Sequence, residues 1–130
     1  MTQLPALVTL LTILLLLGTV LAVGRARGKY AIKAPAISGH PAFERAYRVQ
    51  MNTLEQTVMF LPTLWLAATY GFTGWAGIAG LVWLIGRVWY VVAYLQDATK
   101  RGPGFLLGML GWAALFVMAC IGVMRAMAIG

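Results

Sequence analysis

Apolar residues occur along this chain in four long stretches, each long enough to cross a lipid bilayer as a helix. A membrane-spanning helix needs about 20 consecutive, mostly apolar residues. Short segments rich in glycine and proline separate the stretches, at residues 24–41, 71–74 and 102–104. The pattern predicts transmembrane helices at about 4–24, 42–70, 75–97 and 105–127. We therefore expect an all-α membrane protein, a four-helix up-down bundle that forms one domain over residues 1–130.

Composition and charge agree with this prediction. Hydrophobic residues make up 62% of the 130 residues and charged residues only 10%, and a soluble domain of this length could not hide so many apolar side chains. A net charge of +7 would suit a nucleic-acid-binding protein, but six of the ten basic residues lie between Arg25 and Arg48. Basic residues beside apolar helices typically mark the cytoplasmic side of a membrane. We expect no nucleic-acid partner.

The charged loops also predict the orientation of the helices. No basic residue precedes the first helix, so it is expected to be a retained span and not a signal peptide. In an up-down bundle the first and third loops share one face, which we expect to be cytoplasmic, with the N-terminus outside. The short chain and terse first loop suggest a bacterial inner membrane. The basic residues of these two loops are Arg25, Arg27, Lys29, Lys33, Lys100 and Arg101.

Polar residues interrupt the second and third predicted helices at helical spacing. Residues three and four positions apart lie on one face of a helix, and ionisable residues in membrane helices usually face the bundle interior or a water-filled cavity. The spacing therefore predicts two polar faces that meet in a pocket open to the cytoplasm. The second helix contributes Arg45, Arg48, Asn52 and Glu55, and the third helix with its end contributes Arg87, Tyr90, Tyr94 and Arg101.

Glu55 and Arg87 are expected to pair at the floor of this pocket. Glu55 lies ten residues beyond Arg45, and Arg87 lies ten residues before Asp97, which corresponds to about 15 Å of helix in each case. A buried ion pair can fix helix register without binding any ligand. This purely structural role is the alternative to a binding site. Cationic groups outnumber Glu55, however, so the pocket suits an anion, and the planar guanidinium of arginine is well matched to carboxylates.

Other reactive residues indicate no second site. The single histidine, His40, lacks the companions that a metal site needs. The single cysteine, Cys120, can form no internal disulfide. The seven methionines suit apolar packing better than copper binding. We expect no metal in this protein.

Two segments resemble a known protein family. Residues 43–55 read F-E-R-A-Y-R-V-Q-M-N-T-L-E, and residues 86–95 read G-R-V-W-Y-V-V-A-Y-L. They are similar to helix-two and helix-three motifs of the membrane-associated proteins in eicosanoid and glutathione metabolism, the MAPEG family. The resemblance implies a homotrimer with glutathione bound between neighbouring subunits near the cytoplasmic face. The glutathione contacts that it implies are Arg27, Arg48, Gln50, Asn52, Glu55, Tyr90 and Tyr94.

The resemblance also implies an activity. Arg101 matches the arginine that stabilises the glutathione thiolate, and Arg87 would be the structural partner of Glu55. Gln56 stands where the leukotriene-synthase branch has a tyrosine, so the chain is more similar to the microsomal glutathione transferase branch. We expect a detoxifying glutathione S-transferase, with peroxidase activity as a second possibility. Its thiolate would attack lipophilic electrophiles or reduce lipid hydroperoxides, with glutathione as co-substrate.

Two other functions remain open. One is a non-catalytic lipid-binding or scaffold member of the same family, which an assay of glutathione conjugation would distinguish. The other is a small four-helix multidrug transporter. Such transporters carry a carboxylate in their first helix, whereas residues 4–23 contain no acidic residue.

Overall fold

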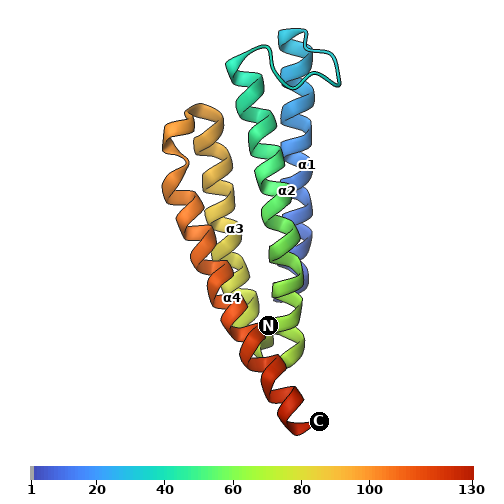
Figure 1. Cartoon of the computed structure of the whole chain (residues 1–130), viewed down its shortest axis with the longest axis vertical. Helices are drawn as coiled ribbons and strands as arrows, with labels where there is room; N and C mark the ends of the chain where they lie inside the picture. Colours follow the sequence, from blue (N-terminus) through green and yellow to red (C-terminus); the bar gives the residue numbers. More distant parts are fainter. Residues whose placement is uncertain (1) are drawn as a thin grey trace.

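A computed structural model describes residues 2–130, and these residues form helices and connecting turns without any β-strand. The middle of the chain, Pro41–Gln96, is one continuous helical run that folds back on itself at a π-helical turn (Figure 1). The elements are α1 (Leu4–Tyr30), α2 (Pro41–Ala67), η1 (Ala68–Phe72), α3 (Thr73–Gln96), η2 (Ala98–Lys100) and α4 (Gly102–Ile129).

Proline and glycine positions explain most of the helix boundaries. A proline lies in the first turn of α1, α2 and α4, where its missing N–H costs no hydrogen bond. Gly71 takes a φ of 110° in the turn between α2 and α3, a backbone conformation that glycine adopts without strain. The turn begins after Ala67, so α2 ends three residues earlier than we predicted.

Two helices extend beyond the predicted limits. α1 continues through Gly24 and Gly28 to Tyr30, and Arg27 and Lys29 lie in its last turn, where cations interact favourably with the carboxyl end of a helix. α4 begins at Gly102 and not at residue 105, because Pro103 is accommodated in its first turn. The basic residues near residue 27 are therefore part of a helix and not of a loop.

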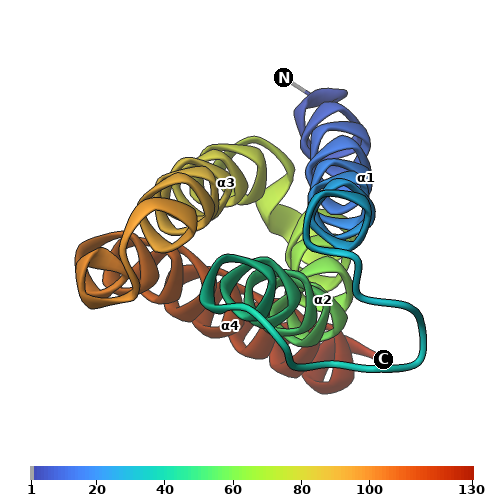
Figure 2. The ribbon, with the colours of Figure 1, turned by 90° about the horizontal axis from the view of Figure 1, so that it is seen from above.

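The helices alternate in direction along the molecule (Figure 1). The connections at residues 31–40 and 97–101 lie at one end, and both described ends of the chain lie toward the other. Seen from above, α2 lies between α1 and α4, and α3 packs beside α4 (Figure 2). Most basic residues lie in the two connections or within about two helical turns of them, and we call this end of the molecule the basic end: Arg25, Arg27, Lys29, Lys33, Arg45, Arg48, Lys100 and Arg101.

Three helical stretches are long and apolar enough to cross a membrane: Leu4–Tyr30, Pro41–Gln96 and Ala98–Ile129. Because Pro41–Gln96 reverses at Gly71, its two arms α2 and α3 are each about 36–40 Å long at the rise of an α-helix, which exceeds the roughly 30 Å of a hydrocarbon core. Large apolar side chains such as Leu10, Leu14 and Leu21 are more than half exposed. This distribution fits an integral membrane protein, whose outer surface contacts lipid.

Glycines bring α3 and α4 together closely enough for their backbones to touch. A Cβ atom added to Gly104 would lie 2.5 Å from the backbone nitrogen of Tyr90, and one added to Gly111 would lie 2.6 Å from that of Trp83. Small residues commonly allow such close approach between membrane helices. The contact at Gly104 fixes the start of α4 directly beside Tyr90.

The main apolar core lies in the half of the molecule away from the basic end. Its centre is a stacked pair of rings, Phe60 from α2 and Trp83 from α3, with centroids 3.7 Å apart and planes 6° apart. Val8 and Leu115 bring α1 and α4 to the same cluster, and all four side chains are buried. This core holds the helices together below the polar region at the basic end.

Candidate functional site

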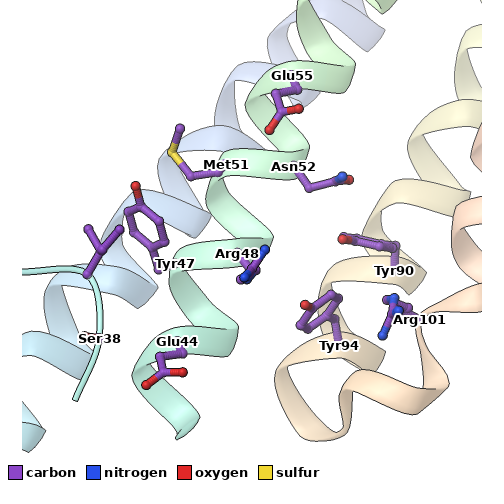
Figure 3. Close-up of a pocket in the computed structure, with 11 residues that line it drawn as sticks. Ser38, Glu44, Tyr47, Arg48, Met51, Asn52, Glu55, Tyr90, Tyr94 and Arg101 are labelled. Atoms are coloured by element: carbon purple, nitrogen blue, oxygen red, sulfur yellow. The ribbon is translucent and has the colours of Figure 1, made fainter. Parts of the chain in front are cut away.

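A cavity of about 710 Å³ opens near the basic end, between α2 and α3 (Figure 3). Its volume lies within the range of about 300–1,000 Å³ that is typical of small-molecule sites. The cavity is lined by Ile37, Ser38, Glu44, Tyr47, Arg48, Met51, Asn52, Glu55, Tyr90, Tyr94 and Arg101. The structure therefore brings together six residues that we predicted as site residues: Arg48, Asn52, Glu55, Tyr90, Tyr94 and Arg101.

Helical spacing explains how α2 lines this cavity. Arg48, Asn52 and Glu55 follow one another at intervals of four and three residues, so they lie along the same side of the helix. Across the gap, Tyr90 and Tyr94 extend from α3 toward α2 (Figure 3). Their rings contact each other at a centroid distance of 5.5 Å. The cavity thus has a polar wall on α2, where the guanidinium of Arg48 and the amide of Asn52 lie among the carboxylates of Glu44 and Glu55, and an aromatic wall on α3.

Arg101 lies at the mouth of the cavity, between η2 and α4. Its Nη1 donates a 2.7 Å hydrogen bond to the carbonyl oxygen of Ala98, and its guanidinium carbon lies 5.6 Å from the ring centroid of Tyr94. A guanidinium has five N–H donors, so this anchoring leaves donors for a ligand. Arg101 is exposed, and it is held over the cavity by its own turn.

The predicted ion pair between Glu55 and Arg87 is not found in the residues that the structure describes. Arg87 is 2% exposed, and its Nη2 donates to Oδ1 of Asn52 and, over 3.3 Å, to Oγ1 of Thr53. Glu55 is exposed on the cavity wall. The two residues were expected to pair because they lie at similar depth, but Asn52 and Thr53 are the α2 residues that point at Arg87.

Arg27 and Gln50, two further predicted contacts, do not line the cavity of a single chain. Arg27 donates hydrogen bonds of 2.7 and 3.5 Å to the carbonyl oxygens of Ala36 and Ile32, and its guanidinium carbon lies 4.9 Å from the ring centroid of Phe43. Within the chain, Arg27 thereby holds the connection between α1 and α2 in place.

The sequence prediction missed five lining residues. Helical spacing could have indicated Glu44, Tyr47 and Met51, because they lie on α2 within one turn of Arg48. Ile37 and Ser38 belong to the connection before α2, whose path no periodicity predicts. Glu44 accepts a 3.2 Å hydrogen bond from the backbone N–H of Gly39, and this contact draws the connection over the cavity.

A second, smaller cavity of about 190 Å³ adjoins the first on the side of α4. It shares Asn52, Tyr90 and Arg101 with the larger cavity and adds Gly102 and Phe105. The ring of Phe105 lies 6.0 Å from that of Tyr90, measured between centroids. We call this space the annex. Arg101 thus borders both the polar main cavity and the annex, which the ring of Phe105 lines.

The long apolar helices and the cavity between two of them define an all-helical integral membrane protein with a cavity of small-molecule size near its basic end. Comparison with known families identifies it more closely. The sequence profile of the MAPEG family matches residues 5–121, and the chain belongs to this family.

Individual relatives cover most of the chain. Uncharacterized protein sll1147 of Synechocystis sp. is 49% identical over 120 residues, which are 92% of this chain and 88% of that protein. Human microsomal glutathione S-transferase 2 is 40% identical over 103 residues, 79% of this chain and 70% of that protein. Rat leukotriene C4 synthase is 37% identical over 124 residues, 95% of this chain and 82% of that protein.

Proposed function

We propose that this protein is a membrane-bound glutathione S-transferase that activates glutathione as a thiolate for attack on lipophilic electrophiles. The observation that carries the proposal is the joint position of Arg48, Asn52, Tyr94 and Arg101 around one cavity near the basic end. Family membership and the similarity to microsomal glutathione S-transferase 2 and leukotriene C4 synthase support it.

The charges of the cavity complement those of glutathione. This tripeptide carries two carboxylates and one ammonium group, and the cavity presents two guanidinium groups, Arg48 and Arg101, together with the carboxylates Glu44 and Glu55. Guanidinium groups bind carboxylates through paired hydrogen bonds. Glu55 or Glu44 then receives the ammonium group. Asn52 and the two tyrosines supply neutral hydrogen-bonding groups between these ends.

Arg101 is the residue that activates the thiol in this proposal. A free cysteine thiol has a pKa of about 8.5, so it is mostly protonated at neutral pH, and a neighbouring cation lowers that value. With an aryl chloride as acceptor, the thiolate sulfur forms a bond to the ring carbon and chloride leaves with the bonding electrons. With a lipid hydroperoxide, two glutathione molecules are oxidised to the disulfide while the peroxide becomes an alcohol and water.

The same proposal includes the membrane arrangement. Four spans with the N-terminus outside would place the basic end and the cavity on the cytoplasmic side, since basic residues favour that side. The membrane in this proposal is a bacterial inner membrane. A homotrimer would allow Arg27 and Gln50 of a neighbouring copy to complete a site that they do not line within one chain.

Glutathione binding and turnover test the proposal on detergent-purified protein. We expect wild-type protein to bind glutathione in calorimetry and to conjugate it to 1-chloro-2,4-dinitrobenzene. Arg48→Ala should weaken glutathione binding by about tenfold or more, because it removes a guanidinium that binds a carboxylate of glutathione. Arg101→Ala should reduce turnover more than binding. Wild-type protein that binds glutathione without any conjugation or peroxide reduction would instead identify a non-catalytic member of the family.

A further inference from the structure

Arg87 is a buried cation that contacts both walls of the cavity without lining it. Its Nη2 hydrogen-bonds to Oδ1 of Asn52, which lines the α2 wall. Its guanidinium carbon lies 3.9 Å from the ring centroid of Tyr90, which lines the α3 wall. With only 2% of its surface exposed, Arg87 reaches a ligand only through these two residues.

The partners of Arg87 are unusual for a buried charge. Its hydrogen bonds go to neutral oxygens of Asn52 and Thr53, and within residues 2–130 its Nε has no hydrogen-bond partner. A buried charge without an ionic partner is costly, and an apolar side chain of similar size would pack there at a lower cost. The arrangement therefore suggests a role for the guanidinium beyond packing.

The geometry at Asn52 indicates that role. A carboxamide has one oxygen that accepts hydrogen bonds and one NH2 group that donates them, whereas a guanidinium only donates. With Oδ1 bound to Arg87, the NH2 group must point elsewhere, and Asn52 borders both the main cavity and the annex. The opposite orientation would set N–H groups of both residues against each other.

From this geometry we infer that Arg87 is a positioning residue: it orients the Asn52 carboxamide so that the NH2 group of Asn52 donates to bound glutathione. The acceptor would be a carbonyl oxygen, a carboxylate oxygen or the thiolate sulfur of that ligand. The inference rests on the proposed function and adds to it that Asn52 acts as a hydrogen-bond donor. The ring of Tyr90, held against the same guanidinium, lies beside this donor (Figure 3).

Asn52→Asp is the substitution that separates a donor from an acceptor. It keeps an oxygen for Arg87, so the fold should be retained, but replaces the NH2 group by a second oxygen that repels an anionic ligand. We expect calorimetry to show at least a tenfold weaker affinity for glutathione and an unchanged or higher unfolding temperature. Affinity equal to or tighter than that of the wild type would show that Asn52 does not donate, and would overturn the inference.

A double-mutant cycle tests whether Arg87 acts through Asn52. Arg87→Met and Asn52→Ala should each weaken glutathione binding, and the double variant should bind no more weakly than either single variant, because both remove the same contact. If the losses of glutathione-binding free energy in the two single variants add up in the double variant, the positioning role of Arg87 is refuted. Arg87→Lys should recover part of the affinity, because an ammonium group can donate to the same oxygen.

Thr53→Val is the matched control for this cycle. Thr53 accepts a hydrogen bond from Arg87 but does not line the cavity, so this variant should lower the unfolding temperature while the affinity for glutathione stays within about twofold of wild type. A large loss of affinity in Thr53→Val would mean that any disturbance of Arg87 weakens the site, which contradicts an effect specific to Asn52.

The two proposals fail in different ways. Wild-type protein that binds no glutathione would refute the proposed function, whereas wild-type binding that Asn52→Asp leaves unchanged would refute only the inference. If Arg87→Met does not yield folded protein, Arg87→Lys takes its place in the double-mutant cycle, and Asn52→Asp still tests the donor role of Asn52 with Arg87 intact.

Discussion

The close approach of α3 and α4 at Gly104 gives a prediction whose size follows from the structure. In Gly104→Ala the new Cβ would lie 2.5 Å from the backbone nitrogen of Tyr90 and 2.9 Å from the carbonyl oxygen of Gly86, where ordinary contacts begin near 3.4 Å. These neighbours are backbone atoms, which cannot rotate away. The two helices must therefore separate by about 1 Å, the kind of overpacking that typically costs about 1–3 kcal/mol.

A matched control is available on α1. A Cβ atom added to Gly18 would have no neighbouring atom within 4 Å, so Gly18→Ala meets open space. Alanine in a helix interior is favoured over glycine by roughly 0.5–1 kcal/mol. This variant should be as stable as wild type or slightly more stable, whereas the same change at Gly104 should give a net loss of up to about 2.5 kcal/mol after this gain is included.

The assay combines thermal unfolding in detergent with turnover. We expect Gly104→Ala to lower the unfolding temperature by several degrees. Turnover should also fall by about tenfold or more, because Arg101 lies three residues before Gly104 and a displacement of about 1 Å at a reacting centre is costly. If Gly104→Ala and Gly18→Ala are equally stable and equally active, the reasoning about this helix contact is wrong.

Three further substitutions should each have a distinct effect. Trp83→Ala removes a fully buried ring stacked on Phe60 and should destabilise the protein by about 3–5 kcal/mol in denaturant unfolding. Because Arg101 borders the annex, an electrophile that meets a thiolate at Arg101 would occupy this space. Phe105→Ala enlarges the annex and should therefore raise kcat/KM for a bulky electrophile relative to a small one, while the affinity for glutathione, measured by calorimetry, stays unchanged. Asp97 accepts hydrogen bonds from the backbone N–H and the hydroxyl of Thr99, which hold the pKa of its carboxyl below the ordinary value of 3.8. Its folded-state pKa is lowered, so Asp97 contributes stability above that ordinary value and loses it as the pH falls through the lowered one. An Asp97→Ala variant should therefore unfold at a lower temperature than wild type at neutral pH, and the difference should shrink at strongly acidic pH.

Helical spacing on α2 predicted correctly that polar side chains of this helix line the same cavity. Arg48, Asn52 and Glu55 line one cavity because intervals of three and four residues keep side chains on one face of a helix whatever packs beside it. Tyr90 and Tyr94 follow the same rule on α3. Spacing of this kind is a local property of the chain.

The partner of Arg87 could not be predicted in the same way. Equal depth along two helices favoured Glu55, but the pairing also depends on how far each helix is rotated about its axis, which only tertiary packing determines. The rotation that the structure shows turns Asn52 and Thr53 toward Arg87. The path of Ile37 and Ser38 over the cavity likewise depends on the contacts of Arg27 and Glu44 with backbone atoms of the connection, and no sequence pattern encodes these contacts.

The alternating course of the helices has a practical consequence for work with this protein. Both described ends of the chain lie toward the end opposite the two connections (Figure 1), whereas the cavity lies near those connections. α4 alone, at 28 residues, spans about 42 Å. An affinity tag or a fluorescent reporter joined at either terminus would therefore lie far from the cavity. Protein that is immobilised on a sensor surface through such a tag should keep its cavity accessible to solution, so that the binding of small ligands can be measured directly.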